Sequence, residues 1–124
     1  MKEITRSQEE ILKIMWLITD GTVSDIKRHL PDPKPAYTTI ATVIKVLEKK
    51  GYVAHKKYGK TYVYFPIVSK KDYTHYLFNN NVIGLFNYSY RQLMSFVIKN
   101  NRLSINELEE IKHIVKKEIQ KQKK

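Results

Sequence analysis

The sequence predicts a mainly α-helical protein that contains one small β-hairpin. Three observations support this fold class. Apolar residues recur at steps of three and four through most of the 124-residue chain, which is the period of an amphipathic helix. Between residues 52 and 65 the period shortens to two, as in a pair of strands. Serine stands three residues before glutamate ahead of two helical stretches, and this capping pattern is typical of helix starts.

Composition points to a polyanionic partner. The net charge of +11 favours nucleic acid, and less strongly an acidic membrane surface. The chain has no cysteine, which excludes disulfides, thiolate metal sites and thiol nucleophiles. The first residues do not form a signal peptide, and no stretch approaches the ~20 apolar residues of a membrane helix. We therefore expect a cytoplasmic protein without membrane insertion.

The first two helices are short and amphipathic. Ser7 and Glu10 fit a capping box for the first, which we expect to end at Asp20-Gly21. Its apolar stripe consists of Ile11, Ile14, Met15 and Ile18. Trp16 is expected to anchor the core rather than bind a ligand. The second helix is expected at residues 25–30 with Ser24 as its N-cap, and the proline-rich residues 31–35 form a stiff connector behind it.

The third helix, residues 37–50, has two contrasting faces. Its apolar stripe consists of Ile40, Val43, Ile44 and Leu47, and its opposite face carries Thr38, Thr42, Lys45 and Lys49 without an acid. Such a helix could place its first turns in a DNA major groove and its later lysines near phosphates. A core helix with a solvated basic face is the alternative.

A basic hairpin follows the third helix. Residues 52–58 and 61–65 read as strands, with Gly59-Lys60 as the turn. Residues 37–64 hold six lysines and one acid, Glu48, for a net charge of +5. Residues 1–66 hold 12 basic and 7 acidic residues, which is also +5. The charge of the first half is therefore concentrated on the third helix and the hairpin.

The order of helix, helix, basic helix and basic hairpin is that of a winged helix-turn-helix DNA-binding domain. Threonines could touch bases and lysines phosphates. Tyr62 could pack the hairpin or bind a phosphate. Because the third helix has no arginine, strong bidentate reading of guanine is not expected from it. The predicted DNA contacts are Thr38, Thr39, Thr42, Lys45, Lys49, Lys56, Lys57, Lys60 and Tyr62.

The second half reads as helical. Ser69 is expected to cap a helix that runs to about Asn80, and Ser104 and Glu107 form a further capping box. Between them, Ile83, Phe86, Tyr90, Leu93 and Val97 keep a helical period that Gly84 and three asparagines weaken. We expect domains at residues 1–68 and 69–124. Because the second has few apolar residues for a core of its own, a dimer is favoured over an intramolecular cap. The predicted dimer contacts are Leu108, Ile111, Val115 and Ile119.

No pattern of catalysis or metal binding stands out. The four histidines include no pair at a helical i, i+4 spacing, and there is no phosphate loop or nucleophile motif. We expect neither an enzyme nor a cofactor.

Several stretches resemble the BlaI/MecI penicillinase-repressor family of bacterial transcription regulators. They are residues 8–16, 37–42, 47–53, 55–57 and 103–111. The resemblance implies a dimeric repressor of a palindromic operator, with an N-terminal winged-helix domain and C-terminal dimerisation helices.

The resemblance also implies a possible regulatory protease. Antibiotic-responsive members are cleaved at an Asn-Phe bond under a membrane sensor system, and the matching position here reads Ser95-Phe96. The phenylalanine is present and the asparagine is not, so inactivation by proteolysis is in doubt. The copper-responsive branch uses a cysteine-rich motif, which this chain lacks. Alternatives to specific DNA binding are a winged-helix protein-interaction module and, less favoured, an RNA binder.

Overall fold

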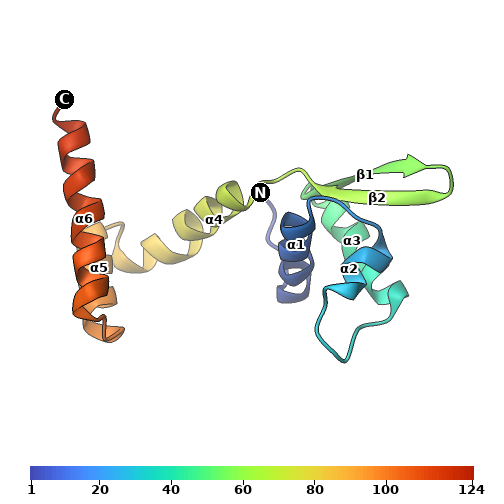
Figure 1. Ribbon diagram of the computed structural model, residues 1–124, viewed down its shortest axis with the longest axis horizontal. Coiled ribbons are helices and arrows are strands. Elements are labelled where there is room, and N and C mark those ends of the chain that lie inside the picture. The colour runs from blue at the N-terminus through green and yellow to red at the C-terminus, as the bar shows by residue number, and fades with distance from the viewer. The chain divides into compact units, whose positions relative to one another are not determined.

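The computed structural model describes residues 1–124 as two compact units, residues 1–78 and 79–124. The first contains three helices, an antiparallel hairpin and a fourth helix (Figure 1). These elements are α1 (Arg6–Ile18), α2 (Val23–Arg28), α3 (Tyr37–Lys49), β1 (Val53–Tyr58), β2 (Thr61–Pro66) and α4 (Lys70–Leu77). The predicted fold class, mainly α with one hairpin, is confirmed.

Two predicted helix starts are wrong by about two residues. Thr5, not Ser7, caps α1, because its hydroxyl accepts from the Gln8 amide while the Gln8 side chain accepts from the Thr5 amide. In α2 the reciprocal pair is Thr22 and Asp25 rather than a Ser24 cap. Overlapping capping patterns lie two residues apart in both places, and the backbone selects the earlier one. The first helix also ends early, at Ile18.

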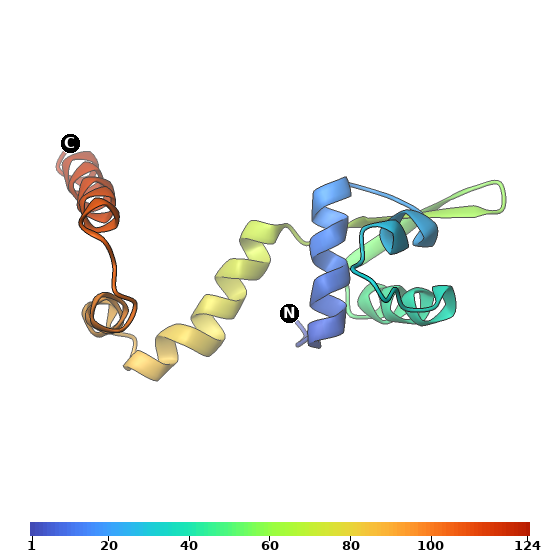
Figure 2. The same ribbon diagram turned by 60° about the horizontal axis from the view of Figure 1, so that its bottom comes forward.

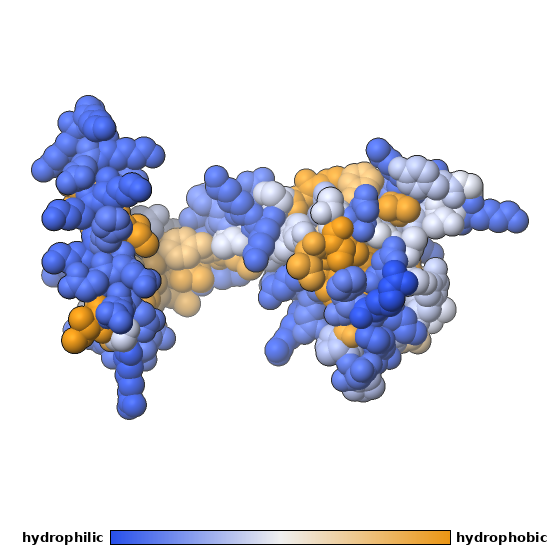
Figure 3. Space-filling view, viewed as in Figure 1, coloured by the Kyte–Doolittle hydropathy of each residue, from blue (hydrophilic) through white to orange (hydrophobic).

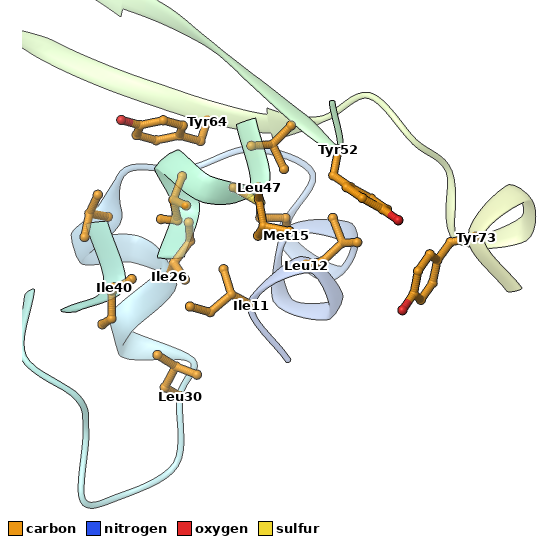
Figure 4. Packing of buried hydrophobic residues seen from close by; sticks show 13 residues of the cluster. Ile11, Leu12, Met15, Ile26, Leu30, Ile40, Leu47, Tyr52, Tyr64 and Tyr73 are labelled. Carbon is orange, nitrogen blue, oxygen red and sulfur yellow. The ribbon is translucent and has the colours of Figure 1, made fainter. Parts of the chain in front are cut away.

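The core of the first unit lies where α1, α2 and α3 meet beneath the base of the hairpin. Apolar side chains from the three helices point toward one another there (Figure 4). Tyr52, Val53 and Tyr64 close the core from the hairpin side. The residues with no exposed surface are Leu12, Met15, Ile26, Ile40, Ile44, Leu47 and Tyr52. Val43, predicted in the apolar stripe of α3, is only half-buried.

Helix α4 is joined to this core by polar and aromatic contacts. Trp16 Nε1 donates to the Val68 carbonyl at 2.8 Å, and the buried Tyr73 donates its hydroxyl to Glu9 Oε2 at 2.7 Å. The Trp16 and Tyr73 ring centroids are 5.7 Å apart. Ser69 caps α4, as predicted. Trp16 is therefore a partly buried anchor between α1 and the segment that leads into α4.

The bond between Tyr73 and Glu9 makes the stability of the first unit depend on pH. The Tyr73 hydroxyl is the main cause that lowers the pKa of Glu9 below 4.5. The stabilisation is present above that value and is lost as pH falls through the lowered pKa of the folded state. We expect Tyr73→Phe to lower the free energy of unfolding by about 1 kcal/mol at neutral pH, and by less at pH 3. Urea unfolding followed by Trp16 fluorescence measures both values, and an equal loss at the two pH values would contradict the assignment.

The second unit is helical, and its chain is interrupted between α4 and α5. A π-helical turn (Phe78–Val82) joins the two units, and a 3₁₀ helix (Ile83–Phe86), α5 (Tyr90–Asn100) and α6 (Ile105–Gln122) follow. The period predicted through residues 83–97 is broken at Asn87 and Tyr88, whose φ angles of 55° and 60° lie in the left-handed region. The Ser104–Glu107 capping box is present at the start of α6.

The second unit lacks a core of its own. Ile83 is its one buried apolar residue, and neither α5 nor α6 contains a buried residue. On α6, Leu108, Val115 and Ile119 are 37%, 52% and 48% exposed. In Figure 3 the visible face of α6 is mostly hydrophilic, and apolar side chains show along its edge. Exposed apolar side chains thus run along one side of α6.

Candidate nucleic-acid interface

Helix α3 separates core residues from polar residues. Ile40, Ile44 and Leu47 are fully buried on one face. The predicted contact residues of this helix all lie on the exposed side, and these are Thr38, Thr39, Thr42, Lys45 and Lys49. Removing their side chains would therefore leave the core intact.

The first turn of α3 has unpaired backbone donors. Its N-cap residue, Ala36, offers no side-chain acceptor, and no acid lies in the first turn. The other five α-helices are each capped by a threonine or serine hydroxyl. The amides at the start of α3, together with the positive end of its dipole, are therefore available to an anion such as a phosphate.

The threonines differ in what they can offer a ligand. Thr42 Oγ1 donates to the Thr38 carbonyl at 2.9 Å, so this hydroxyl keeps only acceptor capacity. The hydroxyls of Thr38 and Thr39 make no hydrogen bond within the chain, so each can both donate and accept. The methyl group of each threonine can also contact a thymine methyl.

The hairpin extends beyond α2 and α3, as Figures 1 and 2 show. Lys57 pairs with Tyr62 across the hairpin, and Lys56 pairs with Val63. Because side chains alternate along a strand, Lys56 and Lys57 project from opposite faces. The Lys57 ammonium lies 5.7 Å from the centroid of the Tyr62 ring. Lys60 lies in the turn and is exposed.

Tyr62 packs within the hairpin and is still 45% exposed. Its ring lies 4.9 Å from His55 and 6.5 Å from Tyr64, centroid to centroid. Together with Tyr37, Lys45 and Lys60, it lines a cavity of about 290 Å³ between α3 and the hairpin. The cavity places lysines from both elements around one opening.

Two contacts fix the base of the hairpin. Tyr64 and Gly21 exchange both backbone hydrogen bonds, at 2.8 and 2.9 Å. On the other strand, His55 Nδ1 meets Glu48 Oε2 at the end of α3. Burial raises the pKa of the Tyr64 phenol, and the nearby Glu48 carboxylate raises it further. Gly21, Glu48 and His55 are not among the predicted DNA contacts, although Glu48 stood out as the single acid of residues 37–64, the basic segment.

One lysine of the basic segment serves the fold. Lys50 Nζ donates to the Glu3 carbonyl and to Gln8 Oε1, both at 2.9 Å. It therefore holds the end of α3 to the start of α1. The basic surface consists of the remaining lysines, 45, 49, 56, 57 and 60, all of them exposed.

The other predicted residues lie in the second unit. Ser95 and Phe96 are in the middle of α5, with the Phe96 ring 51% exposed and 5.3 Å from that of Phe86. Leu108, Ile111, Val115 and Ile119 share one side of α6. The structure contains no group of three or more histidine, cysteine, aspartate or glutamate side chains placed to hold a metal. None of its helices has the length and apolar character needed to span a membrane.

A family model described as penicillinase repressor matches residues 4–117. The chain belongs to the penicillinase repressor family. This confirms the resemblance to BlaI and MecI, and it places the chain among transcriptional repressors rather than enzymes. The methicillin resistance regulatory protein MecI of Staphylococcus aureus (strain N315) is 26% identical over 116 residues, which cover 93% of this chain and 94% of that protein. The penicillinase repressor of Bacillus licheniformis is 24% identical over 114 residues, covering 91% and 89%.

Solved structures support the winged-helix fold of this family member. A mutant of MarR from E. coli aligns with a TM-score of 0.51 at 13% identity, covering 94% of this chain and 79% of that one. The same mutant complexed with operator DNA aligns with a TM-score of 0.50 at 14% identity, covering 93% and 75%. At this identity the likeness establishes the fold alone.

Proposed function

We propose that the protein is a sequence-specific repressor that binds double-stranded operator DNA as a homodimer. One observation carries the proposal. Lysines 45, 49, 56, 57 and 60 are exposed on the outward face of α3 and on the hairpin, whereas every fully buried residue of α3 faces the core. A helix with small hydroxyl side chains in its front turns and lysines behind them suits the major groove and its flanking phosphates.

The dimer follows from the second unit. Leu108, Val115 and Ile119 on α6 are exposed in the single chain, and burial against a second copy would remove them from water. A two-fold dimer would present two copies of α3 to successive major grooves, ~34–36 Å apart. The two-fold symmetry would require a palindromic operator, and the distance between the two helices would set the spacing of its half-sites.

A gel-shift titration tests the function. The probe is duplex DNA from upstream of the protein's own gene, with scrambled duplex as competitor, at two salt concentrations. Tight binding that weakens with salt and resists the scrambled competitor is the expected result. Equal affinity for both duplexes would leave only a nonspecific polycation, and no binding at low salt would favour the protein-interaction module.

The hairpin is the wing of the winged-helix fold. Removing one of its lysines is expected to weaken binding to all DNA sequences alike. Lys56→Ala and Lys57→Ala should each lower the slope of log affinity against log salt by about one unit, because each lost phosphate contact releases one fewer counterion. Fluorescence anisotropy over a salt series measures the slope. Lys71→Ala, which removes an exposed lysine of α4, is the matched control. A loss confined to one base pair of the operator would contradict a phosphate contact.

Regulatory cleavage at Ser95-Phe96, where the asparagine of the family's cleavage bond is missing, would have a structural requirement. Proteases bind extended backbone, and this peptide bond lies within α5. Cleavage there would need local unfolding of the helix.

A further inference from the structure

The single acid of the basic segment lies where an acid costs DNA affinity. Glu48 is near the end of α3, beside a hairpin rich in lysine, and its side chain is 31% exposed. A carboxylate so close to a phosphate-binding surface repels the same phosphates that the lysines attract. Its presence calls for a compensating role, and the structure shows which group it contacts.

Glu48 reaches across from the helix to the first strand of the hairpin. Its Oε2 atom meets His55 Nδ1, and the His55 side chain is 37% exposed. Because a carboxylate only accepts hydrogen bonds, Nδ1 carries the proton that is shared. The imidazole ring also contacts the rings of Tyr62 and Tyr64, whose centroids lie 4.9 and 5.5 Å from its own.

His55 lies where the first strand passes from the buried core to its exposed end. Val53 before it is buried in the core, and Lys56 and Lys57 directly after it are exposed. The second strand is held directly opposite, because Tyr64, the cross-strand partner of His55, forms backbone hydrogen bonds with Gly21. A two-stranded hairpin has little stability of its own, so these contacts determine its direction.

We propose that Glu48 is a positioning residue that holds His55, and through it directs the wing lysines toward DNA phosphates. This inference rests on the proposed DNA-binding function and names a residue that acts without touching DNA. It also makes a prediction of definite sign. Removing a mere surface acid would tighten DNA binding, whereas removing a positioning residue would loosen it.

The test compares Glu48→Ala with Glu48→Gln on the operator duplex. Glu48→Ala is expected to weaken binding about fivefold, equivalent to one lost hydrogen bond, and to lower the salt slope toward that of a wing-lysine variant. Glu48→Gln keeps an oxygen acceptor for His55 and loses the charge, so it should bind at least as tightly as the wild type. Glu10→Ala, which removes an exposed acid of α1, is the control for a change in net charge.

A double-mutant cycle separates positioning from simple loss of stability. Lys57→Ala should weaken binding less in the Glu48→Ala background than in the wild type, because the lysine is already misplaced. Amide hydrogen exchange without DNA is a second readout, and hairpin amides should exchange faster in Glu48→Ala but not in Glu48→Gln. Trp16 fluorescence on unfolding checks that the variants keep the fold.

The outcomes are distinct. Tighter or unchanged binding by Glu48→Ala, or unchanged exchange of the hairpin amides, would overturn the positioning role and leave the repressor function standing. A wild-type protein that binds no duplex would overturn the proposed function, and the inference with it.

Discussion

Replacing Leu108 with aspartate is expected to convert the proposed homodimer to a monomer. Leu108 is 37% exposed in the single chain and begins the apolar stripe that continues through Ile111, Val115 and Ile119. Two carboxylates brought to a shared apolar interface would lose hydration without gaining partners, at a cost of several kcal/mol. Light scattering measures the mass.

Loss of the dimer should have a large effect on operator affinity. Two half-sites bound by a single molecule gain from effective concentration, so a monomer is expected to bind the operator at least ~100-fold more weakly. His113→Asp, a substitution on the other side of α6, introduces the same charge and should leave the dimer intact. A Leu108→Asp protein that remains fully dimeric would show that the interface lies elsewhere.

Truncating Leu47 to alanine is expected to have the largest effect on stability. Leu47 is fully buried on α3 among the side chains of α1 and the hairpin base. Leucine-to-alanine changes at such sites cost about 2–5 kcal/mol, because they remove apolar contact and leave a cavity. For a domain of ordinary stability this is a large share of the total.

The chain provides both the reporter and the control for this measurement. Trp16 is the single tryptophan and lies in the first unit, so its fluorescence follows the unfolding of that unit in denaturant. Leu17→Ala is the same substitution at a residue that is 74% exposed, and its midpoint should barely move. Similar midpoints for the two variants would mean that Leu47 does not belong to a packed core.

The sequence was most informative where local pattern and tertiary packing agree. The helical period of α3 placed Ile40, Ile44 and Leu47 inside and its threonines and lysines outside, because a single helix must bury one face. The period of two located the hairpin, because alternate side chains of a strand lie on opposite faces. Helix starts were less certain, since Thr5 and Ser7 both precede a side chain able to complete a capping box, and only the chain entering the helix decides between them.

Contacts between residues far apart in the sequence could not be predicted from the hydrophobic pattern. The meeting of Glu48 with His55 depends on the angle between α3 and the hairpin, and the tie of Lys50 to Gln8 depends on how α1 packs. The break before α5 uses the left-handed region at Asn87 and Tyr88, although neither residue is a glycine. The opposite projection of Lys56 and Lys57, in contrast, follows from the alternation of side chains in the predicted strand.

The division of α3 into two faces has a consequence for evolution. The hydroxyls of Thr38 and Thr39 form no hydrogen bond within the chain, and the Thr42 hydroxyl bonds only to the Thr38 carbonyl of its own helix. Exchanging them would cost little folding free energy, since surface substitutions of this kind are usually near neutral. Duplicated copies of the gene could therefore diverge toward new operators by changing a few exposed side chains, while the buried face that maintains the fold stays under separate selection.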